Sequence, residues 1–165
     1  MPQTAAADFL AILRILREHG VEFVVVGGVG AVLQGAPLNT FDLDLLHSTE
    51  KDNVNRLLAA LESLHAHYRM QPEKHLKPTE SHLSSPRHQL LMTRHGPLDL
   101  LGAIGNSHNY RELAPHSVEM DIGGGIKVQV LKLEQLIAIK EEIAGPKDVA
   151  VLPILRQTLK EKSGN

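Results

Sequence analysis

The alternation of apolar and polar residues divides the chain into helices and strands. Apolar residues at helical spacing predict an amphipathic helix over residues 4–19 that ends at Gly20. The β-branched run VEFVVV predicts a buried strand over 21–26. Further along, the pattern predicts a brief helix at 27–35, a strand at 39–47, a helix at 48–67 capped by Ser48 or Thr49, a hairpin at 89–102, a hairpin at 117–132 and closing helices at 132–145 and 146–162.

Residues 71–88 have no periodicity and contain three prolines. A loop of this length in a compact domain is usually a functional lid or is disordered. The segment also carries the basic residues Lys74, Lys77 and Arg87, whose charges suit an anionic ligand. We therefore expect a mobile flap beside a ligand-binding cleft; the alternative is a flexible insertion without such a role.

The composition is that of an ordinary globular domain, with 165 residues, 42% hydrophobic residues and a formal net charge of -2. The near balance of charge argues against a general nucleic-acid binder. The chain has no cysteine, which excludes disulfides and a thiolate nucleophile. No apolar run approaches the ~20 residues of a membrane span, and no basic leader precedes the first apolar residues. We expect a cytoplasmic protein with no membrane partner.

The predicted strand 39–47 carries two carboxylates, Asp42 and Asp44, on one face, because residues two apart in a strand project to the same side. Two ionised carboxylates so close repel one another unless a cation lies between them, and Mg²⁺ favours such oxygens. Asp99 is a third acid in the apolar run PLDLLG. If its strand neighbours 39–47, the three converge; the alternative is that all are strand-end acids facing water.

A strand followed by a glycine-rich turn and a helix is typical of an anion site. Gly28 and Gly30 fit the first two positions of the dinucleotide fingerprint G-x-G-x-x-G, but the third falls on Leu33 and the helix is short. A dinucleotide-binding domain and a tight turn without a ligand both remain alternatives at this point.

Three motifs in this order resemble those of nucleotidyltransferases of the DNA polymerase β superfamily. They are Val26-Gly27-Gly28, Asp42-x-Asp44 and Leu98-Asp99-Leu100. More narrowly, GGVGAVLQG, TFDLDLL and the closing LEQLIAIKEEIAGPKDVAVL are similar to stand-alone bacterial nucleotidyltransferase-like proteins related to the AbiEii and MenT toxin group. The resemblance covers about residues 20–158.

The resemblance implies an α/β (α+β) nucleotidyltransferase fold, a mixed sheet flanked by helices. A single domain would span 1–165, with an N-terminal helix at 1–20, a catalytic core at 21–131 and C-terminal helices at 132–162. The implied catalytic residues and ligands of Mg²⁺, or of Mn²⁺ in its place, are Asp42, Asp44 and Asp99. The implied nucleotide-binding residues are Gly27, Gly28, Asn39, Thr40 and Lys140, the last as a phosphate clamp.

The chain departs from that pattern at two positions. Many relatives carry an arginine where Asn39 stands and an acid where Val151 stands. Lys147 and Asp148 match a Lys-Asp pair of the family, although Asp148 is also placed to interact with a helix dipole.

The leading hypothesis is an enzyme that moves a nucleotide from an NTP to a hydroxyl of RNA (such as tRNA), a protein or a small molecule, and releases pyrophosphate. A toxin-antitoxin role, with a cognate antitoxin or partner subunit, is one extension of it. The alternative is a catalytically silent binding protein of the same fold or a subunit of a two-component system. The histidines, such as His65 and His67, lack the spacing of a zinc site, and we expect none.

Overall fold

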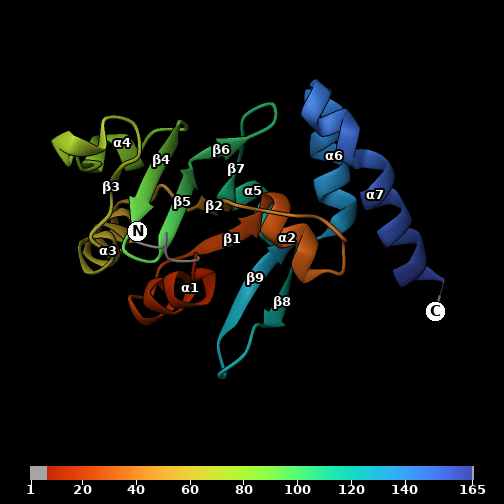
Figure 1. The fold of residues 1–165 in the computed structure, drawn as a ribbon, viewed down its shortest axis with the longest axis horizontal. Helices are drawn as coiled ribbons and strands as arrows, with labels where there is room; N and C mark the ends of the chain where they lie inside the picture. Colours follow the sequence, from red (N-terminus) through yellow and green to blue (C-terminus); the bar gives the residue numbers. More distant parts are fainter. Residues whose placement is uncertain (1–6, 165) are drawn as a thin grey trace, which may run out of the picture.

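A mixed β-sheet forms the centre of the protein (Figure 1), in a computed structural model that describes residues 7–164. Its strands are β1 (Phe23–Val26), β2 (Leu43–His47), β3 (His67–Tyr68), β4 (His88–Thr93), β5 (Gly96–Leu101), β8 (Ser117–Asp121) and β9 (Lys127–Leu131). They lie in the order β3-β4-β5-β2-β1-β9-β8. The short strands β6 (Ala103–Ile104) and β7 (His108–Asn109) pair with each other outside this sheet. The predicted mixed sheet is confirmed.

Helices cover both faces of the sheet. They are α1 (Phe9–Glu18), α2 (Gly27–Leu33), α3 (Lys51–Ser63), α4 (Glu80–Leu83), α5 (Tyr110–Leu113), α6 (Leu133–Ile143) and α7 (Pro146–Ser163), with 3₁₀ turns η1 (Pro72–Lys74) and η2 (Ala114–His116). Buried residues of α1, α3 and α4 share one core with the sheet, and those of α5, α6 and α7 share the other. Figure 1 shows α6 and α7 packed together at the C-terminal side of the molecule.

The alternation within β2 and β5 decides which side chains face which core. Leu43 and Leu45 enter the core of α1 and α3, whereas Leu46 enters the core of α6 and α7. Since side chains alternate along a strand, Asp44 lies on the same face as Leu46. The same reasoning places Asp99 on that face, because its neighbours on β5 enter the first core.

The connection from β1 to β2 excludes a dinucleotide-binding fold. These two strands are antiparallel, with Val26 opposite Asp44, whereas the dinucleotide fingerprint belongs to a unit of parallel strands joined by a helix. The glycine-rich turn therefore serves a different architecture. Within residues 7–164 no helix combines the length and the apolar character that a membrane crossing needs.

Several predicted boundaries were wrong. The first helix begins at Phe9, capped by the side chain of Asp8, and residues 4–6 lie outside the described part of the chain. The strand predicted at 39–47 begins at Leu43, so Asp42 stands just before the sheet. Both hairpins and both closing helices are confirmed, and Gly20 follows the first helix with φ +72°.

The helix predicted at 48–67 is shorter than the pattern indicated. It runs from Lys51 to Ser63, and its N-cap is Glu50, whose N–H donates to the Ser48 hydroxyl. At its other end His65 adopts φ +53°. The chain then forms β3, which the sequence did not indicate because two residues are too few to show alternation and pairing with β4 alone defines them.

Residues 71–88 are not the structureless loop that was predicted. They contain η1 and α4, and α4 begins with a capping box in which Thr79 and His82 bond to each other's backbone N–H. Leu83 is fully buried in the first core. Helices of three and four residues are too short to show a helical repeat, so the sequence pattern did not reveal them. A mobile flap in this segment stays a prediction.

Candidate active site

The carboxylates of Asp44 and Asp99 lie side by side on neighbouring strands. β2 and β5 are parallel, and their register pairs the two residues directly. Burial, followed by the charge of Asp99 and a hydrogen bond with it, raises the pKa of Asp44 from 3.8 to about 7. The charge of Asp42 raises this pKa further, and Lys140 opposes it. Asp44 is therefore partly protonated near neutral pH in the absence of a cation.

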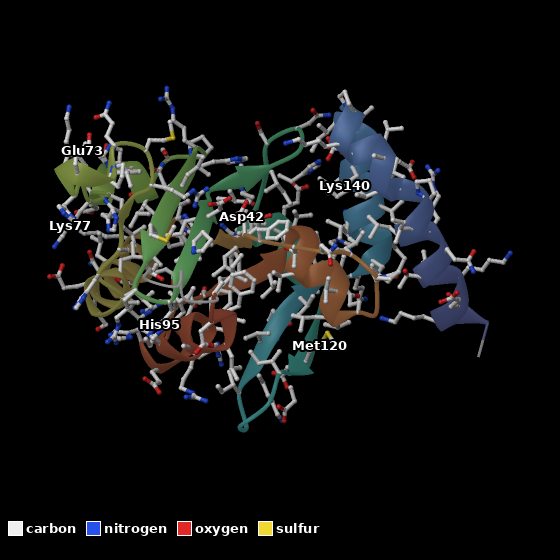
Figure 2. The ribbon with its side chains drawn as sticks, viewed as in Figure 1. Asp42, Glu73, Lys77, His95, Met120 and Lys140 are labelled. Carbon is white, nitrogen blue, oxygen red and sulfur yellow. The ribbon has the colours of Figure 1, made fainter. Side chains whose placement is uncertain are left out.

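Asp42 completes the predicted set from outside the sheet. It is exposed and directly precedes β2, and Figure 2 shows it over the middle of the sheet. Its charge reaches the Asp44 carboxyl group. The three acids thus interact electrostatically, although they come from two segments far apart in the sequence.

Gly27 and Gly28 allow other parts of the chain to approach the turn after β1. A Cβ built at Gly27 would lie 2.2 Å from Oδ2 of Asp44, and one built at Gly28 would lie 2.9 Å from Oγ1 of Thr40. Gly27 also adopts φ +68°, which L-residues with a side chain rarely do. Glycine is required here because Asp44 and Thr40 occupy the space that a side chain would need.

The segment before β2 holds the remaining predicted nucleotide ligands. The Thr40 hydroxyl donates a hydrogen bond of 3.3 Å to the carbonyl of Asp42, which helps to fix the backbone at that acid. Asn39 is exposed. Thr40 therefore lies against the glycine turn, whereas its sequence neighbour Asn39 lies on the surface.

Lys140 lies on α6 (Figure 2). Its Nζ is 3.2 Å from Oδ1 of Asp148, and both side chains are mostly buried, with exposed fractions of 23% and 18%. Its positive charge also reaches Asp44. Lys140 is thus held between an acid of α7 and the acids of the sheet, rather than extended into solvent.

Arg69 is part of the site, and the sequence did not reveal it. Its Nη2 donates to Oδ1 of Asp99 at 3.0 Å, and its Nη1 donates to the carbonyl of Leu91 at 2.8 Å. Arg69 directly follows β3, between a predicted helix and a predicted loop, where no pattern distinguished it from a surface arginine. The signal that could have indicated Arg69 is that an acid within an apolar strand, such as Asp99, needs a partner of opposite charge.

The chemistry of these side chains fits a divalent cation at Asp42 and Asp44. Crowded carboxylates raise the pKa of Asp44, and a hard cation relieves that conflict through oxygen ligands of the kind present here. Across residues 7–164, however, no group of three or more His, Asp or Glu side chains is already arranged as a metal centre. The rings of His67 and His75 contact each other, with centroids 5.3 Å apart.

A family described as "Nucleotidyl transferase of unknown function (DUF2204)" matches residues 5–165. No curated protein matches the chain in sequence. These results agree with the wider resemblance inferred from the three motifs. The narrower resemblance to the AbiEii and MenT group stays a prediction.

Solved structures share the fold at low sequence identity. A protein from Thermotoga maritima, TM1012, described as a candidate nucleotidyltransferase, superposes with a TM-score of 0.58 at 18% identity, covering 93% of this chain and 91% of that one. The lincosamide antibiotic adenylyltransferase LnuA, with lincomycin bound, superposes with a TM-score of 0.58 at 15% identity, covering 93% of this chain and 99% of that one. ANT(2")-Ia, in complex with adenylyl-2"-tobramycin, superposes with a TM-score of 0.58 at 16% identity, covering 93% of this chain and 89% of that one.

Proposed function

The chain belongs to the nucleotidyl transferase family of unknown function DUF2204, and on that premise we propose that it transfers a nucleotide from an NTP to a hydroxyl group with the help of Mg²⁺. The observation that carries the proposal is the pairing of Asp44 with Asp99 across two parallel strands. That register brings the third acid of the motif set beside the Asp42–Asp44 pair. The alternation of side chains along β2 and β5 places both acids on the face of the sheet that α6, the helix of Lys140, covers.

We assign the cation to Asp42 and Asp44, with Asp99 beside them. A bound divalent cation would neutralise charge on the triphosphate. Gly27, Gly28, Asn39 and Thr40 would contact the nucleotide, and Lys140 would bind a phosphate oxygen. This last assignment rests on a lysine that already lies near Asp44.

Asp99 is the base in this proposal. It would accept the proton of the attacking hydroxyl, whose oxygen forms a bond to the α-phosphorus while the bond to pyrophosphate breaks. No protein nucleophile is needed, so catalysis would depend on positioning and on charge neutralisation. The burial of Asp99, which is 9% exposed, would help to exclude water from this proton transfer.

The acceptor we favour is a small molecule that carries a hydroxyl group. The support is that two neighbours of this fold, LnuA and ANT(2")-Ia, hold an antibiotic and an adenylylated antibiotic. The alternatives are an RNA or a protein acceptor, and a role with an antitoxin or partner subunit. The experiment below includes RNA and protein acceptors beside the small molecules.

The test is a binding measurement followed by a transfer measurement. Calorimetry with each of the four NTPs, in Mg²⁺ or Mn²⁺, should reveal one or more that bind only with the metal. The α-labelled form of that NTP is then incubated with a lincosamide, an aminoglycoside, tRNA and cell-extract protein. Transfer should disappear in Asp44→Asn and persist in Asp52→Asn, which changes an exposed acid on α3.

A wild-type protein that binds no NTP with either metal, and that behaves like Asp44→Asn in every assay, would refute the enzyme. Binding without transfer to any acceptor would instead favour the silent relative. In that case Asn39 and Val151, the two departures from the family pattern, are the first positions to restore.

A further inference from the structure

Arg69 reaches Asp99 across an intervening strand. Its backbone N–H donates to the carbonyl of Leu90 at 2.9 Å, so it stands beside Leu90 at the edge of the sheet. Leu90 in turn pairs with Asp99. The guanidinium group therefore extends over β4 to bond with the acid on β5. This arrangement forms a row across the sheet of Arg69, Leu90, Asp99 and Asp44.

Two hydrogen bonds fix the guanidinium plane. One goes to Oδ1 of Asp99 and the other to the carbonyl of Leu91, which is itself part of the sheet. Because Arg69 is anchored to the backbone, it fixes the orientation of the Asp99 carboxylate as well as its charge. Asp44 hydrogen-bonds to the same carboxylate from the opposite strand.

Stability alone gives little reason for this ion pair. The side chains of Arg69 and Asp99 are only 28% and 12% exposed, and removing such a pair from water costs much of what its attraction returns. Leucines fill most neighbouring positions of β4 and β5, so an apolar pair would suit the sheet equally well. Orientation of the Asp99 carboxylate therefore explains this ion pair better than stability does.

We propose that Arg69 is a positioning residue of the transfer reaction, which holds the Asp99 carboxylate by one oxygen so that the carboxylate faces the acceptor hydroxyl. The proposal rests on the function proposed above. Arg69 approaches from the β3 side of β5 and β2, whereas Gly27 and Gly28 follow β1 on the other side of these two strands. It therefore acts on the acceptor side and contributes little to nucleotide binding.

The experiment separates transfer from binding. Arg69→Gln should lower kcat for label transfer about 30- to 100-fold, and the affinity for the metal-bound NTP should stay within about twofold. The acceptor is the one found in the screen above, or water, measured as release of nucleoside monophosphate. Arg69→Lys should recover part of the rate, and guanidinium ion should do the same for Arg69→Ala. Arg56→Gln is the matched control, since Arg56 also donates to a carbonyl and pairs with an acid, Glu22, away from these carboxylates.

A double-mutant cycle tests whether Arg69 acts through Asp99. Once Asp99→Asn has removed the base, adding Arg69→Gln should have no further effect on the residual rate. Additive losses, or equal losses of NTP affinity and kcat, would overturn the positioning role, and so would an Arg69→Gln protein as active as wild type. If Arg69→Gln does not fold, Arg69→Lys carries the comparison. A wild type that neither binds NTP nor transfers label refutes the proposed function itself, and the role of Arg69 falls with it.

Discussion

The carboxylate of Asp44 lies against the Cα of Gly27: a methyl group added there would be 2.2 Å from Oδ2 and 3.0 Å from Cγ of Asp44. The turn after β1 and the acid on β2 therefore fit together only without a side chain at Gly27. The glycine of the first motif and the second aspartate of the next one form a single structural unit.

Gly27→Ala should destabilise the protein by about 2–4 kcal/mol, because it combines a left-handed backbone with this overlap. Gly125→Ala is the control, since Gly125 also has positive φ (+76°) but open space around it. It should cost about 1–2 kcal/mol. Urea unfolding measures both, and equal losses would show that the contact with Asp44 adds nothing.

Asp44→Asn should stabilise the metal-free protein above neutral pH. The pKa of Asp44 is raised to about 7 by burial and by Asp99, so the folded protein binds a proton more tightly than the unfolded chain. Ionisation then costs stability as the pH rises from about 4 to about 7. In EDTA the variant should gain about 1–2 kcal/mol over wild type at pH 8 and little at pH 4. A difference that does not change with pH would contradict this account.

Lys140→Ala should weaken NTP binding about tenfold and leave cation binding unweakened, because a phosphate clamp adds charge complementarity without coordinating the ion. Titrations with Mn²⁺ alone, and then with Mn²⁺ and an NTP, separate the two. Lys147→Ala is the control on the neighbouring helix. Loss of Mn²⁺ binding in Lys140→Ala would show instead that this lysine maintains the arrangement of the acidic side chains that bind the ion.

His108 should stabilise the protein most in mildly acidic solution. It bonds to Glu142 at 2.7 Å and also to Glu112. The bond to Glu142, followed by that to Glu112, raises the pKa of His108 above 6.5, and the bond to His108 lowers the pKa of Glu142 below 4.5. The contribution of His108 to the free energy of unfolding is complete below pH 6.5 and is lost as the pH rises through its pKa in the folded protein. The contribution of Glu142 is complete above pH 4.5 and is lost as the pH falls below that value.

The loss of stability in His108→Gln should therefore be largest between about pH 4.5 and 6.5 and should shrink at higher pH. Urea midpoints measured across this range check it. His116→Gln, at an exposed position nearby, should show no such maximum. A loss of stability that is constant from pH 5 to pH 9 would mean that His108 stabilises the protein without a charge interaction with Glu112 and Glu142.

Local patterns revealed the motifs and most of the elements. The alternation around Asp42 and Asp44 predicted a strand with acids on one face, and Gly27 and Gly28 predicted a turn that needs no side chain. These features depend on neighbours within a few residues, so a single sequence contains them. The boundary at Leu43 was missed because pairing with other strands decides it, and the boundary at Ser63 because the turn around His65 decides it.

Only the tertiary structure decided which distant residues meet. The identity of Asp99 as the partner of Asp44 depends on the parallel register of β2 and β5, which no local pattern specifies. Arg69 entered the site only because β3, two residues long, pairs at the edge of the sheet. The sequence by itself determined the glycine turn and the two acidic motifs, because each depends on residues close together in the chain. Strand order and register determined their contacts, because these arise from packing between segments that lie far apart along the chain.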